Sequence, residues 1–242
     1  MSALLVLDRV SKHFRGLVAV DQASLAVEAG EICGVIGPNG AGKTTLFNMI
    51  AGVFVPDQGS IAFRGQRIDG LSADKVCRQG IGRTFQLVRP FPALSVEDNV
   101  IVGGLLHRTS VGDARVHAHD LLRRLDLYDK RHQRASSLTL PDRKRLEVTR
   151  ALATDPHLLL LDEVMAGLRP TETDRMVGVL KALNRDTGLT IVLIEHVMRA
   201  VMALASHIVV LHHGALIADG APESVVRDAA VIESYLGVET PA

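Results

Sequence analysis

The sequence predicts an α/β fold whose core is a mainly parallel sheet, joined to an antiparallel β region and an inserted helical region. Three apolar runs of strand length, residues 32–36, 158–161 and 190–194, suit strands that are buried on both faces. A helical pattern over residues 172–184 lies between the second and third runs, which predicts a β-α-β unit. The first run leads directly into a glycine-rich loop, at the end of the strand where parallel sheets bind their ligands.

Short strands and turns dominate the first part of the chain. Residues 4–7 and 24–27 are predicted strands, and residues 44–51 form the predicted helix after the glycine-rich loop. Turn residues at 56–59 precede another predicted strand at 60–63. This part of the sequence is therefore rich in β-structure and carries one helix.

Helical patterns replace strands from about residue 92 to residue 134. Ser95 before two acidic residues is typical of a capped helix start, and the leucines of residues 121–125 follow a helical period. A further helix is predicted over residues 143–154. These patterns indicate a helical subdomain at about residues 92–154.

A hairpin follows the β-α-β unit. Residues 208–211 and 215–218 are its predicted strands, around the turn His212-His213-Gly214, and terminal helices follow. With no internal repeat or linker, we expect one domain over residues 1–242. Its α/β core takes up about residues 1–91 and 155–242.

Composition restricts the classes of function. The chain has 242 residues, of which 47% are hydrophobic, which is enough to bury a substantial core. Lys plus Arg and Asp plus Glu number 27 each, so no excess of positive charge points to nucleic acid, and no nucleic-acid partner is predicted. Cys33 and Cys77 lack metal or redox spacing and are expected to be two small hydrophobic residues in a reducing compartment.

The sequence contains no segment that is expected to insert directly into a membrane. The short apolar run at the N-terminus has no basic region before it, so no signal peptide is expected. No run reaches the roughly 18 to 20 apolar residues that a membrane span needs. The predicted location is cytoplasmic, and any role at a membrane must come through a partner.

The glycine-rich loop carries the clearest chemistry. It fits the pattern G-x-x-x-x-G-K-[ST], in which backbone N–H groups and a helix N-terminus surround phosphate groups. A glycine-rich turn that binds nothing is the alternative, but strand, loop and helix occur in the order that the motif requires. The residues expected to contact the nucleotide here are Gly37, Pro38, Asn39, Gly40, Ala41, Gly42, Lys43, Thr44 and Thr45. Lys43 would contact the β- and γ-phosphates, and the Thr44 hydroxyl would bind Mg²⁺.

Two carboxylates close the apolar run at residues 158–161. Asp162 is the predicted Mg²⁺ ligand, through water, and Glu163 is the predicted base that polarises the water attacking the γ-phosphate. Alone, an acidic pair after a strand is more often an ordinary strand end. Together with the phosphate loop, it predicts ATP hydrolysis with ATP and Mg²⁺ as cofactors.

These motifs, in this order, resemble those of the nucleotide-binding subunit of ATP-binding cassette (ABC) transporters over residues of about 5 to 237. The resemblance implies a P-loop NTPase of the ABC ATPase type with a RecA-like core. It also implies that Gln86 senses Mg²⁺ and the γ-phosphate beside the membrane subunit, that His196 is a switch residue at the γ-phosphate, and that Phe14 stacks on adenine. Alone, each would be an ordinary surface, strand-end or core residue. The histidines without a role in this pattern, expected on the surface or in turns, are His117, His119, His212 and His213.

Residues 138–142 stand where the family has its signature, which binds the ATP of the opposing subunit. Thr139 keeps the hydroxyl for that contact and is predicted to form a capping box with Asp142. Pro141 removes one N–H donor, and Asp142 adds an anion where phosphate would bind. We therefore expect a weakened half-site and two unequal sites with a different partner subunit, and higher ATPase activity if Gly and Gln are restored at 141 and 142.

Two further positions depart from the family pattern. Val164 replaces the usual proline after the catalytic glutamate, and Arg169 stands in the loop that usually carries an aspartate. Communication between the two ATP sites is therefore less well supported than ATP binding.

The resemblance is strongest to the subunit that serves branched-chain amino-acid uptake, in residues 82–86, 145–147, 166–168 and 231–237. It implies two integral membrane permease subunits, a second ATPase subunit in a homodimer or heterodimer, and an extracytoplasmic binding protein. The chain would then be peripheral on the inner face of the cell membrane. Uptake of amides or urea, a soluble ATPase acting on nucleic acid or ribosomes, and a small-molecule kinase are the alternatives.

Overall fold

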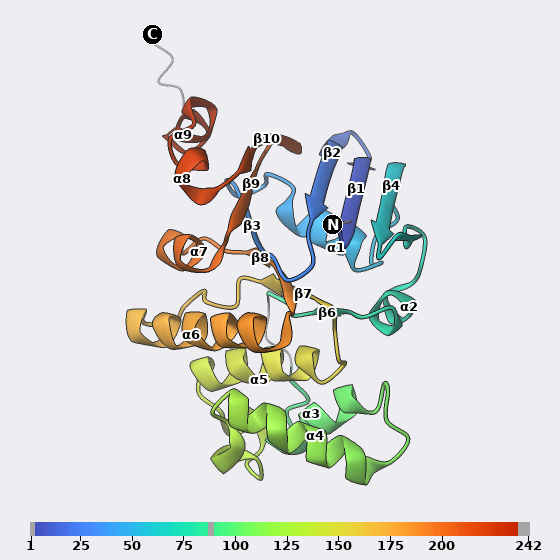
Figure 1. Cartoon of the computed structure of the whole chain (residues 1–242), viewed down its shortest axis with the longest axis vertical. Helices are drawn as coiled ribbons and strands as arrows, with labels where there is room; N and C mark the ends of the chain where they lie inside the picture. Colours follow the sequence, from blue (N-terminus) through green and yellow to red (C-terminus); the bar gives the residue numbers. More distant parts are fainter. Residues whose placement is uncertain (1–2, 87–89, 237–242) are drawn as a thin grey trace.

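The computed structural model describes residues 3–86 and 90–236 (Figure 1). A six-stranded sheet lies at the centre of the fold, with a four-stranded sheet beside one face and helices on the other. Gly237, the last residue of the tail that resembles the branched-chain subunit, lies outside the described residues.

The central sheet is parallel except at one edge. Its strand order is β10-β9-β3-β8-β7-β6, and only the β9–β10 pair is antiparallel. The strands are β3 (Ile32–Ile36), β6 (Ile81–Arg83), β7 (Leu158–Asp162), β8 (Thr190–Ile194), β9 (His207–His212) and β10 (Ala215–Gly220). The predicted apolar strands and the hairpin are thus confirmed, and every residue of β3, β7 and β8 is buried.

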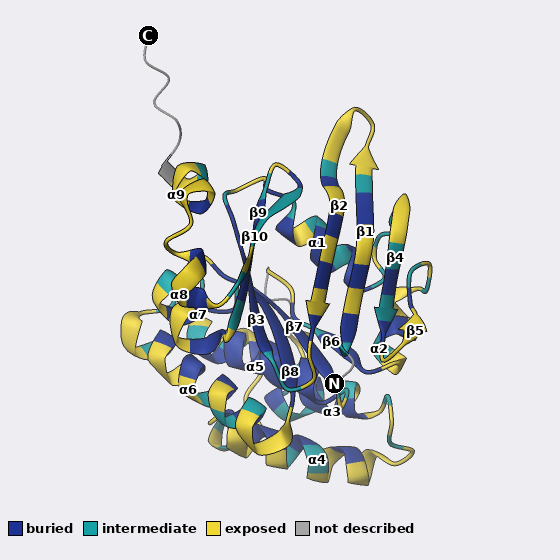
Figure 2. Cartoon of the chain, turned by 45° about the horizontal axis from the view of Figure 1, so that its top comes forward, coloured by how far each residue is buried: buried dark blue, intermediate teal, exposed yellow. Residues whose placement is uncertain are grey.

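The two faces of the sheet pack into different cores. Leu159 and Leu161 of β7 pack with the helical region, whereas Leu158 and Leu160 pack with the antiparallel sheet and α1 (Lys43–Ile50). Alternation along one strand therefore holds both layers against the central sheet. Figure 2 shows the strands of this sheet as buried.

The antiparallel sheet has the order β2-β1-β4-β5. Its strands are β1 (Leu5–Phe14), β2 (Leu17–Val27), β4 (Gln58–Phe63) and β5 (Gln66–Arg67). The predicted strands at residues 4–7 and 24–27 were much too short. Pairing of β1 with β2 continues past irregularities in register at the exposed polar residues Asp8 and Arg9, as far as Phe14 opposite Leu17.

The helical region contains α3 (Val96–Gly104), α4 (Val111–Arg124) and α5 (Leu140–Leu152), linked by the short 3-10 turns η1 (Tyr128–Lys130) and η2 (Ala135–Ser137). The Ser95 hydroxyl accepts a hydrogen bond from Asp98 N at 3.0 Å, which confirms the predicted cap. α5 begins three residues before the predicted helix at 143–154, because Pro141 fits its first turn. Figure 2 shows the exposed outer face of α4.

The β-α-β unit is confirmed as β7, α6 (Pro170–Thr187) and β8. α6 extends beyond the predicted 172–184 at both ends and stops at Gly188, which adopts a left-handed φ of 69°. The remaining helices are α2 (Ala73–Arg78), α7 (Met198–Leu204), α8 (Pro222–Val225) and α9 (Ala229–Leu236). Within residues 3–86 and 90–236, no helix combines the length and hydrophobicity that a membrane crossing requires.

Candidate functional site

The glycine-rich loop joins β3 to α1 and requires glycine at two positions. Gly37 has φ 146°, and a Cβ there would lie 2.0 Å from Leu211 O. Gly42 has φ 103°, and a Cβ there would lie 2.2 Å from Ala19 O. The loop is therefore packed against β9 and β2 so closely that no side chain fits at either residue.

Lys43 begins α1 and its side chain turns back into the loop. Its Nζ donates to Gly37 O and Pro38 O, each at 2.8 Å. Burial lowers the pKa of Lys43, while Glu163 and Asp162 act in the opposite direction. The ammonium group is thus placed among loop carbonyls, close to the two carboxylates at the end of β7.

A cavity of about 640 Å³ brings most of the predicted nucleotide-binding residues together. The residues that line it are Phe14, Leu17, Val18, Ala19, Asn39, Gly40, Ala41, Gly42, Lys43, Thr44, Thr45, Gln86, Glu163, His196 and His213. Phe14, at the end of β1, is 39% exposed and meets Phe54 edge to face with ring centroids 5.2 Å apart. The Phe14 ring is therefore partly exposed at the wall of the cavity, where a flat group could stack on it.

Glu163 lies between two side chains from other segments. Gln86 Nε2 donates to Glu163 Oε2 at 2.9 Å, and His196 Nε2 lies 2.8 Å from Glu163 Oε1. The Glu163 backbone has a left-handed φ of 51°, which is unusual for a residue with a side chain. Two hydrogen bonds hold it there, from Glu163 N to Ile194 O at 2.9 Å and from Lys144 Nζ to Glu163 O at 2.7 Å.

Asp162 is 1% exposed and belongs to an adjoining cavity of about 460 Å³. Thr44 and Gln86 line the same cavity. Burial raises the pKa of Asp162, and the ion pair with Arg83, at 3.3 Å, lowers it. Asp162 Oδ1 is buried and has no hydrogen-bond partner among residues 3–86 and 90–236.

These three residues fit a hard divalent cation. A hydroxyl, an amide and a carboxylate supply the oxygen ligands that Mg²⁺ prefers, and the unpartnered Asp162 Oδ1 is available. Within the described part of the chain, no group of three or more His, Cys, Asp and Glu side chains is arranged for a metal ion. A site with one carboxylate is compatible with that result, because Mg²⁺ usually completes its shell with water and phosphate oxygens.

Thr139 lies away from this cavity, at the N-terminus of α5. It lines a separate cavity of about 360 Å³ together with Lys130, Pro141, Asp142 and Arg145. The predicted capping box is wrong, because the Thr139 hydroxyl donates to Asp142 Oδ2 at 2.9 Å and no side chain caps the helix.

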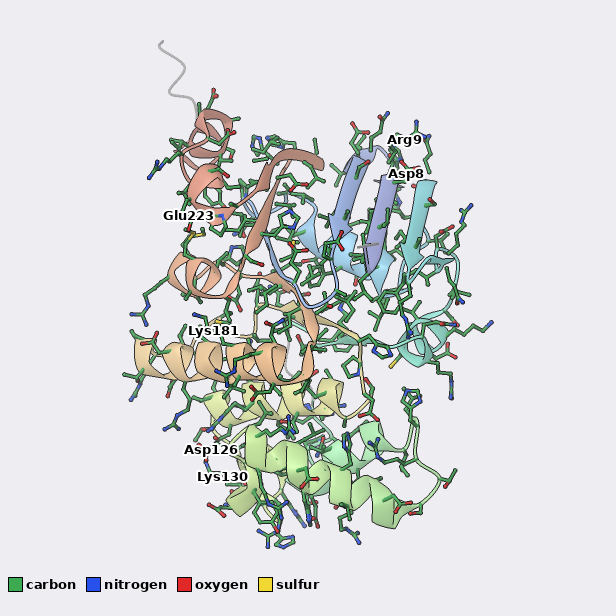
Figure 3. All side chains as sticks on the ribbon, viewed as in Figure 1. Asp8, Arg9, Asp126, Lys130, Lys181 and Glu223 are labelled. Atoms are coloured by element: carbon green, nitrogen blue, oxygen red, sulfur yellow. The ribbon has the colours of Figure 1, made fainter. Side chains whose placement is uncertain are left out.

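The Asp142 carboxylate is 2% exposed and bound by cations. Oδ2 also accepts from Lys130 Nζ, and Oδ1 accepts from Arg145 Nη2 at 2.5 Å. Burial raises the pKa of Asp142, but the hydrogen bonds from Lys130, Thr139 and Arg145 outweigh burial and keep the pKa below its ordinary value. Asp126, whose carboxylate accepts from Arg145 at 3.0 Å, and Lys130 lie at the same end of the helical region (Figure 3).

Sequence reasoning missed several residues around the site. Arg83, Lys144 and Glu195 contact Asp162, the Glu163 carbonyl and Met165 N respectively. All three are charged residues within apolar or helical stretches. A charged residue at such a position is a weak sign of a functional or ion-paired side chain, and the sequence offered no stronger one. His213 lies in a turn as expected, but it also lines the nucleotide cavity.

The chain matches known families and relatives over most of its length. A family model described as ABC transporter matches residues 20–166, and one described as branched-chain amino acid ATP-binding cassette transporter matches residues 215–240. The chain is 37% identical over 249 residues to the high-affinity branched-chain amino acid transport ATP-binding protein BraF of Pseudomonas aeruginosa, covering 97% of this chain and 98% of BraF.

Two more relatives and a solved structure extend the comparison. The corresponding protein LivG of Escherichia coli strain K12 is 38% identical over 249 residues, covering 97% of this chain and 98% of LivG. The lipopolysaccharide export system ATP-binding protein LptB of the same strain is 34% identical over 236 residues, with the same coverage. A crystal structure of a nucleotide-free ATP-binding cassette superposes with a TM-score of 0.89 at 28% identity, over 97% of this chain and 99% of that chain. The predicted cassette fold is thereby confirmed.

Proposed function

Because the chain belongs to the ABC transporter family, we propose that it is the ATP-hydrolysing subunit of an importer for branched-chain or related amino acids. The observation that carries the proposal is the single cavity of about 640 Å³ that unites the phosphate loop with Glu163, Gln86 and His196. A nucleotide bound through its phosphates at Lys43 would place the γ-phosphate within reach of these three side chains.

The residues of the nucleotide cavity have different roles in the proposed reaction. The loop N–H groups and Lys43 hold the β- and γ-phosphates, and Phe14 stacks on the base. Glu163 accepts the proton of the water whose oxygen attacks the γ-phosphorus, as the bond to the β–γ bridging oxygen breaks and ADP leaves. His196 and Gln86 hold the Glu163 carboxylate in the cavity, as their contacts at 2.8 and 2.9 Å indicate.

Thr44, Asp162 and Gln86 are proposed to hold Mg²⁺. When bound, the cation neutralises charge on the β- and γ-phosphates. The chain's own contribution is to present three oxygen-bearing side chains in one cavity, with Asp162 Oδ1 unpartnered by any described residue.

The proposed assembly has two permease subunits in the membrane, a second cassette subunit and an extracytoplasmic binding protein, with this chain peripheral on the inner membrane face. Thr139 at α5 would face the ATP of the second subunit. We also propose the core at about residues 1–91 and 155–242 and the helical subdomain at about 92–154 as the parts of one domain.

A second candidate function is ATP hydrolysis for lipopolysaccharide export. It is favoured by the similarity of the chain, over nearly its whole length, to LptB, which is named for that export system. The match at residues 215–240 supports the amino-acid importer instead.

The test is to co-express the chain with the membrane subunits encoded beside it and measure uptake of labelled leucine into vesicles. Recruitment to membranes by those subunits with leucine uptake supports the proposal. Hydrolysis stimulated by nucleic acid, or phosphoryl transfer to a metabolite, would contradict it.

A further inference from the structure

Arg83 ends β6 and lies beside the end of β7, where Asp162 and Glu163 follow one another. β6 and β7 are parallel neighbours, with Arg83 opposite Leu160. The side chain of Arg83 is 9% exposed, and its Nη2 donates to Asp162 Oδ2 at 3.3 Å. A buried guanidinium is therefore in direct contact with the carboxylate proposed to serve Mg²⁺.

The guanidinium is held by contacts besides the ion pair. Its Nη1 donates to Asn48 Oδ1, in α1, at 2.6 Å. Its central carbon lies 5.2 Å from the centre of the Phe85 ring, next to Gln86. Contacts on α1, β7 and the segment leading to Gln86 fix its orientation, because a planar fork can meet Asn48 and Asp162 at once only in one position.

The neighbouring residue holds the Asp162 backbone. Thr84 Oγ1 accepts a hydrogen bond from Asp162 N at 3.0 Å, and Thr84 is fully buried. Adjacent residues of one segment thus hold Asp162 by its carboxylate and by its main chain. The side chain and backbone of Asp162 are both positioned before any ligand binds.

In this arrangement the two carboxylate oxygens of Asp162 differ in their hydrogen bonding. Oδ2 accepts from Arg83, whereas Oδ1 is buried and has no hydrogen-bond partner in the described part of the chain. Thr44 and Gln86 line the same cavity as the Asp162 carboxylate. Leaving a buried carboxylate oxygen unpaired costs free energy unless a ligand satisfies it, so the free oxygen indicates where a cation belongs.

We propose that Arg83 is a positioning residue for the divalent cation bound with ATP: it occupies Asp162 Oδ2 and so directs Oδ1 to the cation. The inference rests on the proposed function and adds to it Arg83, which lines the same cavity and is proposed to act through its contact with Asp162. Partners of this kind, one contact away from a metal, are typically worth 10- to 100-fold in metal affinity.

The test compares purified full-length wild type with Arg83→Met and Arg83→Lys. The affinity for a non-hydrolysable ATP analogue is measured in excess EDTA and again in saturating Mn²⁺, and the ratio gives the gain due to the metal. Arg67→Met is the matched control, since Arg67 is an exposed arginine paired with Asp69 outside both cavities. Thermal unfolding is followed for every variant.

The expected result is a metal-dependent gain that falls at least about tenfold in Arg83→Met, with metal-free affinity unchanged within about twofold. Arg83→Lys, which keeps the charge but loses the fork, should lie between wild type and Arg83→Met, and Arg67→Met should match wild type. Should Arg83→Met fail to fold, the same ratio in Arg83→Lys decides.

Two results would overturn the inference. One is an unchanged metal-dependent gain in a folded Arg83 variant. The other is an equal loss of metal-free and metal-bound affinity, which is what a purely structural role produces. A wild type that does not bind the analogue at all would instead contradict the proposed function, so the two failures are distinguishable.

Discussion

His196 Nε2 lies 2.8 Å from Glu163 Oε1, so the ends of the neighbouring strands β8 and β7 meet through their side chains inside the nucleotide cavity. Gln86 reaches the other oxygen of the same carboxylate from the segment after β6. Three strand ends thus converge on Glu163. A ligand that contacts Glu163 in this cavity therefore lies beside His196 and Gln86 as well.

Phe14→Ala should weaken ATP binding. The exposed ring of Phe14 lines the nucleotide cavity, and stacking on a base is worth about 1 to 3 kcal/mol, which corresponds to about 5- to 150-fold in Kd. Titration of the variant with a fluorescent ATP analogue measures the change. Phe91→Ala is the control, because Phe91 is similarly exposed but does not line this cavity. Equal affinities for Phe14→Ala and wild type would remove Phe14 from the site.

Asp142→Asn should destabilise the helical region. The Asp142 carboxylate binds Lys130 and Arg145 in a nearly buried position, and removing one partner from a buried ion pair typically costs about 3 to 5 kcal/mol. The partial exposure of Lys130 places the expected loss at the lower end of that range. Urea unfolding gives the value. Asp120→Asn, in an exposed pair with Arg123, should change little. A loss no larger than the control's would show that the Asp142 network contributes little.

Pro141→Gly alone should raise ATP hydrolysis by the assembled transporter. It restores an N–H donor at the start of α5 without disturbing Asp142, whereas the double change to Gly and Gln would also break the contacts to Lys130 and Arg145. The rate is measured in the complex with its membrane subunits. Unchanged or lower activity, in a variant of unchanged stability, would contradict the proposal that residues 138–142 form a weakened half-site.

Glu195→Gln should stabilise the protein increasingly as the pH rises. Burial raises the pKa of Glu195 to about 7, so the folded chain binds this proton more tightly than the unfolded chain does. The stability from the bound proton is fully present below pH 4.5 and is lost as pH rises through about 7, and the difference between the two pKa values corresponds to about 3 kcal/mol.

The Gln side chain stays neutral and can still accept from Met165 N, as Glu195 does at 2.7 Å. Unfolding free energies of wild type and Glu195→Gln, measured at pH 5 and pH 8, should therefore diverge toward pH 8. A difference that does not change with pH would mean that Glu195 titrates normally in the folded chain.

Much of the central sheet could be predicted because burial on both faces leaves a continuous apolar run, as in β7 and β8. β6 gave no such signal, since it has three residues and one of them is Gly82. The length of β1 and β2 was missed for a different reason: the exposed polar pairs Asp8-Arg9 and Asp21-Gln22 interrupt the apolar alternation, and the register of pairing shifts between Leu7 and Val10.

The site shows the same division. Lys43, Thr44, Asp162 and Glu163 lie in local motifs whose spacing carries the chemistry, so the sequence alone predicts a role for each of them. The contacts of Arg83 and Lys144 join residues 79 and 19 positions apart along the chain, and no local pattern records them. The partners of Asp142 were missed likewise: the capping box follows from spacing alone, whereas Lys130 reaches the carboxylate only through the fold.

The most direct test of the central claim is the rate of ATP hydrolysis by the Glu163→Gln variant, measured beside its affinity for ATP. If this cavity hydrolyses ATP with Glu163 as the base, the rate should fall by about 10² to 10⁴ while ATP affinity stays near that of wild type. A variant that hydrolyses ATP at the wild-type rate, or that loses binding and hydrolysis together, would contradict the account.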